Sequence, residues 1–378
     1  MSDRWNRVSM AGEDLQEPAW APATGAYNLL RLRAERIGIC VRPMTLLSAT
    51  VALGILACTS EQTLTEPSTG LTPVRTGIGA YTAVDLGSLT GDFGNSFASD
   101  INPAGQVVGS SQTGFNSPES HAVLWTDGDI RDLGTLGGQL SHAAAINPAG
   151  EVVGSSFILP SSPANAVHAF LWKNGVMTDL GTLGGRESEA SDINPAGQVV
   201  GGSEIGGGAS AKSVFLWTKG VMTNLGFESP LQGSPGALNP AGRVVAGGTL
   251  WDRGVAIPLG TLGGCCTFAN AINPAGQVVG LSYLPQNQVY HAFLWDKGVM
   301  RDLGTLGETS EATDINSKGQ IVGTSGNRAF LWENGVMTEL ISLDRRFASH
   351  AAAINPAGEI VGSSTTERGT RATLWRRK

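Results

Sequence analysis

Short apolar segments alternate with tight-turn sequences along most of this chain. In one unit, a predicted strand ends at Ile193, residues 194–197 read Asn-Pro-Ala-Gly, and a segment with β-branched residues at Val199 and Val200 follows. Proline presets φ at the second position of a turn, and glycine accepts a positive φ at the fourth. Apolar runs this short, bounded by turn residues, predict β-strands rather than helices.

The second half of the same unit continues this arrangement. After a loop of variable length, one apolar run covers residues 214–217, a Thr-Lys-Gly turn covers 218–220, and another run covers 221–225. Sister units carry Asn-Gly at this second turn, as at Asn174, and this dipeptide is a strong hairpin signal. Four strands joined in this order predict a small antiparallel sheet.

The unit recurs seven times. Each copy contains an Asn-Pro-Ala-Gly-type turn, whose first residue occurs at Asn102, Asn147, Asn194, Asn239, Asn273, Asn316 and Asn355. Each copy also ends its third strand on Trp, at Trp125, Trp172, Trp217, Trp251, Trp295, Trp332 and Trp375. One such sheet cannot bury its own apolar face, so neighbouring units must cover one another.

The two ends of the array indicate whether it is open or closed. A fourth-strand phrase, typically Asp-Leu-Gly, begins the array near Asp85, whereas the array finishes on a third strand at Trp375. Residues 81–86 therefore supply the fourth strand that the last unit lacks, which favours a closed ring. The sequence predicts an all-β fold, a seven-bladed β-propeller of four-stranded antiparallel blades over residues 81–378, closed by an N-terminal strand. A β-solenoid or a pair of sandwiches remains the alternative.

The N-terminal region predicts export. Residues 44–57 form an apolar run that is too short to span a bilayer and fits the apolar part of a signal peptide. Ile-Leu-Ala-Cys at 55–58 resembles the lipobox of bacterial lipoproteins, whose Cys is diacylated, so Cys58 is the expected lipid attachment site. Ordinary secretion after cleavage and a retained anchor remain alternatives. Residues 1–43 fit no signal design and are interpreted as an over-extended N-terminus, and residues 58–80 as a flexible tether rich in Thr, Ser, Pro and Gly.

The leader and the net charge predict where the protein is located and argue against nucleic acid as a partner. The protein is expected to be extracytoplasmic, either lipid-anchored to the bacterial envelope (outer membrane) or secreted, and to contact the membrane only through the lipid. The formal net charge is −7, which argues against nucleic acid as a partner. The 52 glycines and 18 prolines stay below the fraction typical of low-complexity disorder, so a folded chain is expected.

The cysteines leave one question open. Cys265 and Cys266 are adjacent and are the only cysteines within residues 81–378, so the sequence contains no disulfide framework. Neighbouring cysteines either close a strained eight-membered ring or stay reduced in a loop. The reduced state is the expectation, because a ring between neighbours closes almost no chain and stabilises little.

Motifs for catalysis or ligand binding are weak. Gly-Thr-Leu-Gly-Gly loops, as at 134–138, lack the Lys-Ser/Thr ending of a phosphate-binding loop and lead into strands. The five histidines show no metal-ligand spacing, and no Gly-x-Ser-x-Gly motif supports a Ser-His-Asp triad. Asp100, Asp192 and Asp314 precede the Ile-Asn turns and are interpreted as solvated strand ends, with a cation-binding ring as the alternative. No cofactor, metal ligand or catalytic residue is predicted.

The repeated phrases resemble a known family. His-Ala-Phe-Leu-Trp from His168, Asp-Leu-Gly-Thr-Leu-Gly-Gly from Asp179 and Ile-Asn-Pro-Ala-Gly from Ile193 are similar to those of the HAF-repeat family of bacterial extracellular repeat proteins. The resemblance implies secretion and a repeated structure, without an established activity. The complete His-Ala-Phe occurs only at His168 and His291, and its drift elsewhere indicates a structural or incidental histidine.

The function predicted from these features is an interaction scaffold for a protein or a glycan. The loop between the second and third strands varies in length among units and carries aromatic residues, and repeat proteins commonly bind partners where such insertions gather. Phe157, Tyr283 and Tyr290 are the predicted partner-binding residues. The protein is expected to be a monomer. A binding scaffold is expected rather than an enzyme. A propeller hydrolase or lyase acting on an extracellular polymer is the alternative.

Overall fold

The computed structural model describes residues 81–378 except 116, 160–165, 207–211 and 229–235. Every regular element in this part of the chain is a β-strand, which confirms the predicted all-β class. The segments interpreted as over-extended N-terminus, leader and tether lie outside the described residues, and so does the expected lipid attachment site, Cys58.

The strands pair in antiparallel groups of four. Three groups from the first half of the chain are β2 (Ser96–Ile101), β3 (Val107–Gln112), β4 (Ser120–Thr126) and β5 (Asp129–Asp132); β6 (Gly137–Ile146), β7 (Val152–Ile158), β8 (Val167–Lys173) and β9 (Val176–Asp179); and β10 (Gly184–Ile193), β11 (Val199–Ile205), β12 (Lys212–Thr218) and β13 (Val221–Glu228). A single parallel bridge between Ser120 and Leu140 connects the β2–β5 group with the β6–β9 group.

The second half of the chain continues in the same way. Its groups are β14 (Ala237–Leu238), β15 (Val244–Ala246), β16 (Thr249–Asp252) and β17 (Val255–Pro258); β18 (Thr267–Ile272), β19 (Val278–Tyr283), β20 (Tyr290–Asp296) and β21 (Val299–Asp302); and β22 (Ser310–Ile315), β23 (Ile321–Ser325), β24 (Arg328–Glu333) and β25 (Val336–Glu339). In the last group, β26 (Ser349–Ile354), β27 (Ile360–Thr366) and β28 (Gly369–Arg377) are joined by β1 (Tyr81–Asp85).

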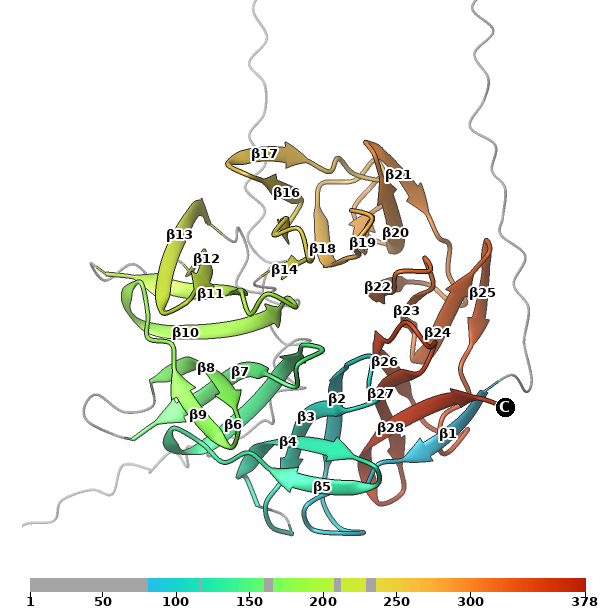
Figure 1. Ribbon diagram of the computed structural model, residues 1–378. Coiled ribbons are helices and arrows are strands. Elements are labelled where there is room, and N and C mark those ends of the chain that lie inside the picture. The colour runs from blue at the N-terminus through green and yellow to red at the C-terminus, as the bar shows by residue number, and fades with distance from the viewer. Residues whose placement is uncertain (1–80, 116, 160–165, 207–211, 229–235) are drawn as a thin grey trace, which may run out of the picture. The chain divides into compact units, whose positions relative to one another are not determined.

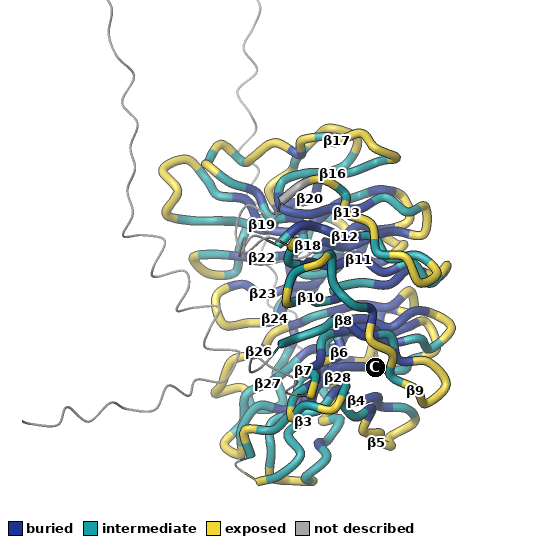
Figure 2. The backbone as a smooth tube through the Cα atoms, turned by 90° about the vertical axis from the view of Figure 1, so that its left-hand side faces the viewer, coloured by how far each residue is buried: buried dark blue, intermediate teal, exposed yellow. Residues whose placement is uncertain are grey.

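These sheets stand side by side around a ring, and the strand that leads into the Asn-Pro-Ala-Gly-type turn is the innermost of each sheet (Figure 1). The apolar clusters lie between consecutive sheets. Val108 and Leu124 of one sheet, for example, pack with Ile146 and Phe170 of the next. Figure 2 shows the buried residues along the strands and most exposed residues in the connecting turns and loops. Each sheet is therefore covered by its neighbours, as the repeat predicted.

The observed backbone explains the turn residues and one glycine within the strands. Asn174 and Gly175 have φ values of 53° and 87°, the two positive values that a type I′ hairpin turn requires. Gly197, which ends an Asn-Pro-Ala-Gly turn, has a φ of 75°. A Cβ atom at Gly154 would overlap the carbonyl oxygen of His142, so only glycine allows β7 to approach β6 this closely.

The asparagine of each repeated turn contacts its own turn and the next sheet. Asn194 Oδ1 accepts hydrogen bonds of 3.0 Å from the backbone N–H groups of Ala196 and Gln198. Its Nδ2 donates to Gln198 Oε1 at 2.8 Å and to the carbonyl oxygen of Asn239 at 3.4 Å. All seven of these asparagines are buried, and their side chains bond to backbone groups of the turn and of the next sheet.

The bonds from one repeated asparagine to the next form a closed ring. Each Nδ2 donates to the carbonyl oxygen of the asparagine that follows, at 3.0 to 3.4 Å, in the order Asn102, Asn147, Asn194, Asn239, Asn273, Asn316 and Asn355. Asn355 in turn donates to the carbonyl oxygen of Asn102 at 3.4 Å. The first and last repeats are therefore neighbours in space.

The strand nearest the N-terminus lies in the sheet formed by the last three strands. β1 pairs antiparallel with β28, with Tyr81 opposite Arg377 and Asp85 opposite Thr373. Asp85 also forms an ion pair of 3.0 Å with Arg371. Residues separated by nearly the whole described chain thus share one sheet.

Candidate interaction face

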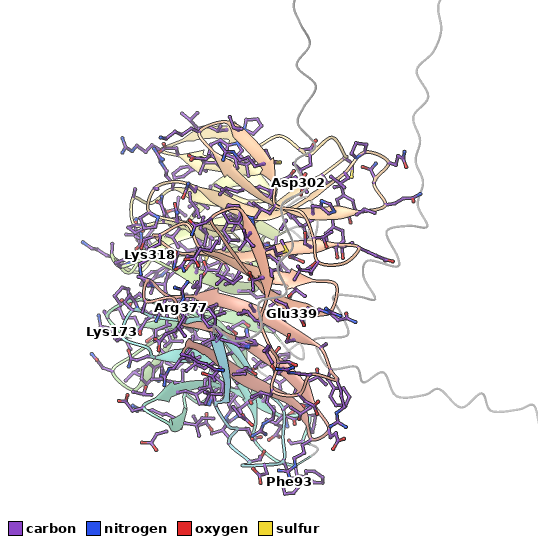
Figure 3. The ribbon with its side chains drawn as sticks, turned by 90° about the vertical axis from the view of Figure 1, so that its right-hand side faces the viewer. Phe93, Lys173, Asp302, Lys318, Glu339 and Arg377 are labelled. Carbon is purple, nitrogen blue, oxygen red and sulfur yellow. The ribbon has the colours of Figure 1, made fainter. Side chains whose placement is uncertain are left out.

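The ring has two different sides. The turn face carries the Asn-Pro-Ala-Gly-type turns and the two-residue turns between third and fourth strands. The loop face carries the loops between second and third strands and the crossings to the next sheet. Figure 3 shows Lys173, at the end of β8, and Lys318, in a turn, on one side and Asp302 and Glu339, at the ends of fourth strands, toward the other. Differences between repeats are concentrated on the loop face, where the second loop covers residues 113–119 in one repeat and only 326–327 in another.

The three residues predicted to bind a partner lie at strand ends on the loop face. Tyr283 ends β19 and lies opposite Tyr290, which begins β20, and their ring centroids are 5.6 Å apart. Phe157 lies in a different sheet, in β7 opposite Val167. All three side chains are half-buried. Their role in binding stays a prediction.

A more exposed aromatic pair lies beside the first complete repeat. Phe93, in the crossing from β1 to β2, is 60% exposed, and Phe115, in the β3–β4 loop, is 69% exposed. Their ring centroids are 5.7 Å apart with an interplanar angle of 84°, an edge-to-face arrangement that aromatic rings favour. Figure 3 shows Phe93 projecting at the edge of the molecule. Sequence reasoning missed Phe93, although the crossing at 87–95 departs from the Gly-Thr-Leu-Gly-Gly of its sisters.

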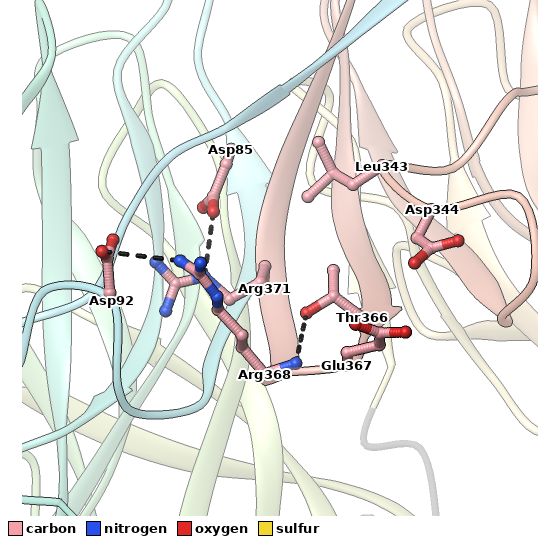
Figure 4. Close-up of a pocket in the computed structure, with 8 residues that line it drawn as sticks. All are labelled: Asp85, Asp92, Leu343, Asp344, Thr366, Glu367, Arg368 and Arg371. Atoms are coloured by element: carbon pink, nitrogen blue, oxygen red, sulfur yellow. Dashed lines mark hydrogen bonds and ion pairs between the residues drawn. The ribbon is translucent and has the colours of Figure 1, made fainter.

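An open cleft of about 300 Å³ is lined in part by Asp92, the residue that precedes Phe93 (Figure 4). Its lining residues are charged or polar with one exception, and they are Asp85, Asp92, Leu343, Asp344, Thr366, Glu367, Arg368 and Arg371. Asp92 forms an ion pair of 3.5 Å with Arg368. Arg346, beside the cleft, pairs with Asp344 and Glu367 at 2.7 Å. The cleft therefore presents both signs of charge beside an exposed aromatic pair.

Arg371 holds this region together. It is buried and donates to Asp85 Oδ2 at 3.0 Å and to the carbonyl oxygens of Gly91 and Gly94 at 3.0 to 3.1 Å. These bonds fix the crossing that carries Asp92 and Phe93 against β28. Arg371 therefore has a structural role, and a ligand in the cleft would meet the more exposed residues.

The histidines of the His-Ala-Phe phrase contact the outermost strand. Nδ1 of His168 lies 2.8 Å from Asp179 Oδ2, and the same pair recurs as His121–Asp132 and His291–Asp302. In two further sheets the position holds the pairs Arg328–Glu339 and Arg371–Asp85. Arginine does not act as a base in proteins, so the shared property is a contact between a basic and an acidic residue. This supports the interpretation of the histidine as structural.

Ser156 completes a superficial likeness to a catalytic triad. It lies opposite His168, which in turn contacts Asp179 on the next strand. The Ser156 hydroxyl is buried, accepts from the Leu136 N–H at 2.9 Å, and lies 3.1 Å from the carbonyl oxygen of Phe157. An activated nucleophile needs a hydrogen bond between its hydroxyl and the general base, whereas the Ser156 hydroxyl is hydrogen-bonded to backbone groups.

The interpretation of Asp100, Asp192 and Asp314 as solvated strand ends is wrong. Each innermost strand has a register shift at this point, and the carboxylate bonds to two backbone amides. Asp192 Oδ1 accepts from the N–H of Ile193 at 2.7 Å, and Oδ2 accepts from the N–H of Leu238, in the next sheet, at 2.8 Å. Asp100 and Asp314 repeat both bonds. These side chains connect adjacent sheets.

Burial raises the pKa of all three carboxyl groups. The pKa of Asp192 and of Asp314 reaches about 7, because burial and the charge of Asp100 outweigh the opposing effect of the backbone N–H groups. Burial also raises the pKa of Asp100. The centre of the ring therefore carries less charge near neutral pH than the same residues would carry in water.

In the described part of the chain, no group of three or more His, Cys, Asp or Glu side chains is placed to hold a metal ion. Residues 81–378, apart from their gaps, also contain no helix with the length and apolar character of a membrane span.

Comparison with known proteins identifies the fold. No protein-family model and no curated protein matches the chain. The β-propeller domain of the Trilobed protease from Pyrococcus furiosus matches with a TM-score of 0.51 at 9% identity, over 76% of this chain and 96% of that one. The chain described here is a β-propeller.

Other propeller structures match less closely. TolB from Acinetobacter baumannii has a TM-score of 0.36 at 15% identity, over 75% of this chain and 58% of TolB. Trypanosoma rangeli sialidase has a TM-score of 0.42 at 10% identity, over 79% of this chain and 59% of the sialidase. This chain thus spans less than two thirds of either protein. The match to the Trilobed protease propeller establishes the fold alone, and the function has to be inferred from the residues of this propeller.

Proposed function

We propose that this chain is a seven-bladed β-propeller, closed by its N-terminal strand, that acts as an extracytoplasmic interaction scaffold for a protein or a glycan. The ring of hydrogen bonds among the seven repeated asparagines supports the number of blades and the closure. The pairing of β1 with β28 supports the part played by the N-terminal strand.

The observation that carries the binding role is the exposure of Phe93 and Phe115 on the face where the blades differ. Burying exposed aromatic surface is a main source of affinity, and interface hot spots are aromatic or arginine side chains within a polar rim. The cleft supplies this rim with Asp92, Glu367 and Arg368. The predicted contacts Phe157, Tyr283 and Tyr290 lie on the same face.

The binding role is tested by a pair of double variants of the full chain, screened against immobilised envelope glycans and envelope proteins. Phe93→Ser with Phe115→Ser should weaken the strongest interaction found by at least about ten-fold, because aromatic hot spots contribute this much or more. Lys173→Glu with Lys318→Glu, on the turn face, is the matched control and should bind like the parent. Weakened binding in the lysine variant, with binding unchanged in the phenylalanine variant, would contradict a partner-binding site on the loop face.

Attachment to the cell envelope is a separate proposal that rests on the lipobox-like sequence at 55–58. Acylation of Cys58 would tether the propeller to the envelope through residues 58–80. Cys58→Ala should abolish fatty-acid labelling and release the protein from membranes. Labelling that persists in this variant would contradict lipid attachment there without affecting the proposed binding face.

A further inference from the structure

The crossing from β17 to β18 places two thiols side by side. The Sγ atoms of Cys265 and Cys266 are 2.6 Å apart, not far from the ~2.05 Å of a disulfide bond. Both cysteines are free thiols, with Cys265 exposed and Cys266 partly exposed. The pair lies on the loop face, where an oxidant in solution reaches it.

Backbone contacts hold the pair in this position. The N–H of Gly264 donates to the carbonyl oxygen of Tyr283 at 2.9 Å, and the N–H of Tyr283 donates to the carbonyl oxygen of Cys266 at 3.0 Å. Asn287, from the β19–β20 loop, accepts a hydrogen bond of 2.6 Å from the N–H of Cys265. These bonds hold the backbone of both cysteines against β19 and the β19–β20 loop.

Sister crossings show that the propeller does not need thiols at this point. After the same Gly-Thr-Leu-Gly-Gly phrase, the equivalent residues are Gln139-Leu140 in one blade and Arg186-Glu187 in another. Both of those crossings also lead into an innermost strand. The thiol pair is therefore an addition to one blade, and the fold gives no reason for it.

We propose that Cys265 and Cys266 form a reversible dithiol–disulfide pair, a redox-modified site on the loop face beside Tyr283. With a disulfide oxidant such as oxidised glutathione, the Cys265 thiolate attacks one glutathione sulfur and releases one glutathione. Cys266 then loses its proton and attacks the Cys265 sulfur, which forms the Sγ–Sγ bond and releases the second glutathione. In total the protein loses two hydrogens and two glutathione molecules are formed.

The exposure of the two thiols gives them different parts in this exchange. Burial raises the pKa of the Cys266 thiol to about 11, so the exposed Cys265 is the group that first meets the oxidant. The resulting ring closes almost no chain and adds little stability. Disulfides of this strained kind are readily reduced, as reversible regulatory disulfides are. Oxidation changes the covalent structure directly beside the Tyr283–Tyr290 pair.

The test is equilibration of the full, folded chain with mixtures of reduced and oxidised glutathione, followed by acid quench, alkylation and peptide mass spectrometry. In oxidising mixtures the peptide that contains Cys265 and Cys266 should lose two hydrogens and take up no alkylating reagent. Reduction should restore both alkylation sites. Cys266→Ser should trap glutathione on Cys265, because the second thiol that displaces it is absent.

A matched control separates redox chemistry from folding. Cys265→Gln with Cys266→Leu copies the crossing at 139–140 and should melt like the parent, whereas it no longer responds to the glutathione ratio. Two alkylatable thiols at every ratio would overturn the proposal. A glutathione adduct on the parent chain, or a disulfide between two chains in place of the internal ring, would also overturn it. None of these outcomes depends on whether the loop face binds a partner.

Discussion

The turn face and the loop face of this propeller are built from the same repeated unit, yet their side chains differ in what they contact. On the turn face, the repeated asparagine bonds to its own turn and to the next blade in every copy. On the loop face, loop length varies and Phe93 and Phe115 remain exposed. Each asparagine on the turn face thus connects its blade to the next, whereas loop length and exposed aromatic residues vary on the loop face. This comparison predicts large stability effects on one face and small ones on the other.

Removing β1 should have the largest effect. Deletion of residues 81–85 takes away the hydrogen bonds to β28 and the Asp85–Arg371 ion pair, and it exposes the edge of the last sheet. The variant should aggregate or melt far below the parent in a thermal unfolding scan. Deleting five residues from the preceding segment, at 70–74, is the control and should leave the melting temperature unchanged. If both deletions melt like the parent, β1 does not close the ring.

Asn194→Ala should have the next largest effect. The substitution leaves the N–H groups of Ala196 and Gln198 and the carbonyl oxygen of Asn239 without their side-chain partner. A group that loses its partner costs up to about 1–3 kcal/mol, and relaxation and access of water to the partly exposed turn reduce the sum, so a loss of about 2–4 kcal/mol is expected in urea unfolding. Asn194→Asp keeps the acceptor and should lose less. Equal losses in the two variants would show that the acceptor is unimportant.

Asp192→Ala should have a smaller effect that depends on pH. It removes acceptors from the N–H groups of Ile193 and Leu238, at a cost of about 1–3 kcal/mol. Because the pKa of Asp192 is raised to about 7 in the folded protein, its protonated form stabilises the fold, and this contribution is lost as pH rises through 7. The destabilisation measured by urea unfolding should therefore be larger at pH 5 than at pH 8. A loss that grows with pH would contradict the raised pKa.

Changes at the exposed aromatic pair should have the smallest effect on stability. Phe93→Ser with Phe115→Ser removes little buried apolar area from the folded protein, so the free energy of unfolding should change by less than about 0.5 kcal/mol. Urea unfolding of this variant beside Asn194→Ala measures the contrast between the faces directly. A large loss would mean that the pair packs as core and is not available to a partner.

The sequence predicted the elements that depend on neighbouring residues along the chain. Asn-Gly and Asn-Pro-Ala-Gly specify their turns locally, and the strands between them follow. The contacts of Asp192 could not be predicted, because one acceptor bond reaches Leu238 in the next blade. Each of the three aspartates lies in a blade that is followed by a blade with Ala at the equivalent position. Asp100 bonds to Ile146 in a blade whose own equivalent residue is Ala145.

The candidate site was predicted less completely than the fold. Unequal loop lengths pointed to the loop face, whereas the particular aromatic pair depends on two loops that meet only in the folded ring. Phe93 and Phe115 are 22 positions apart and come from different connections. Burial on folding, which separates these two rings from the half-buried Phe157, is a property of tertiary structure that no local pattern encodes.

Hydrogen–deuterium exchange of the full chain, with and without the partner found by the screen, tests the central claim most directly. Bound partner should protect amides at residues 91–95 and 113–115, on the loop face, and leave the turns at 102–106 and 147–151 at their unbound exchange rates. Protection confined to those turns, with the loop-face segments exchanging as before, would contradict the account.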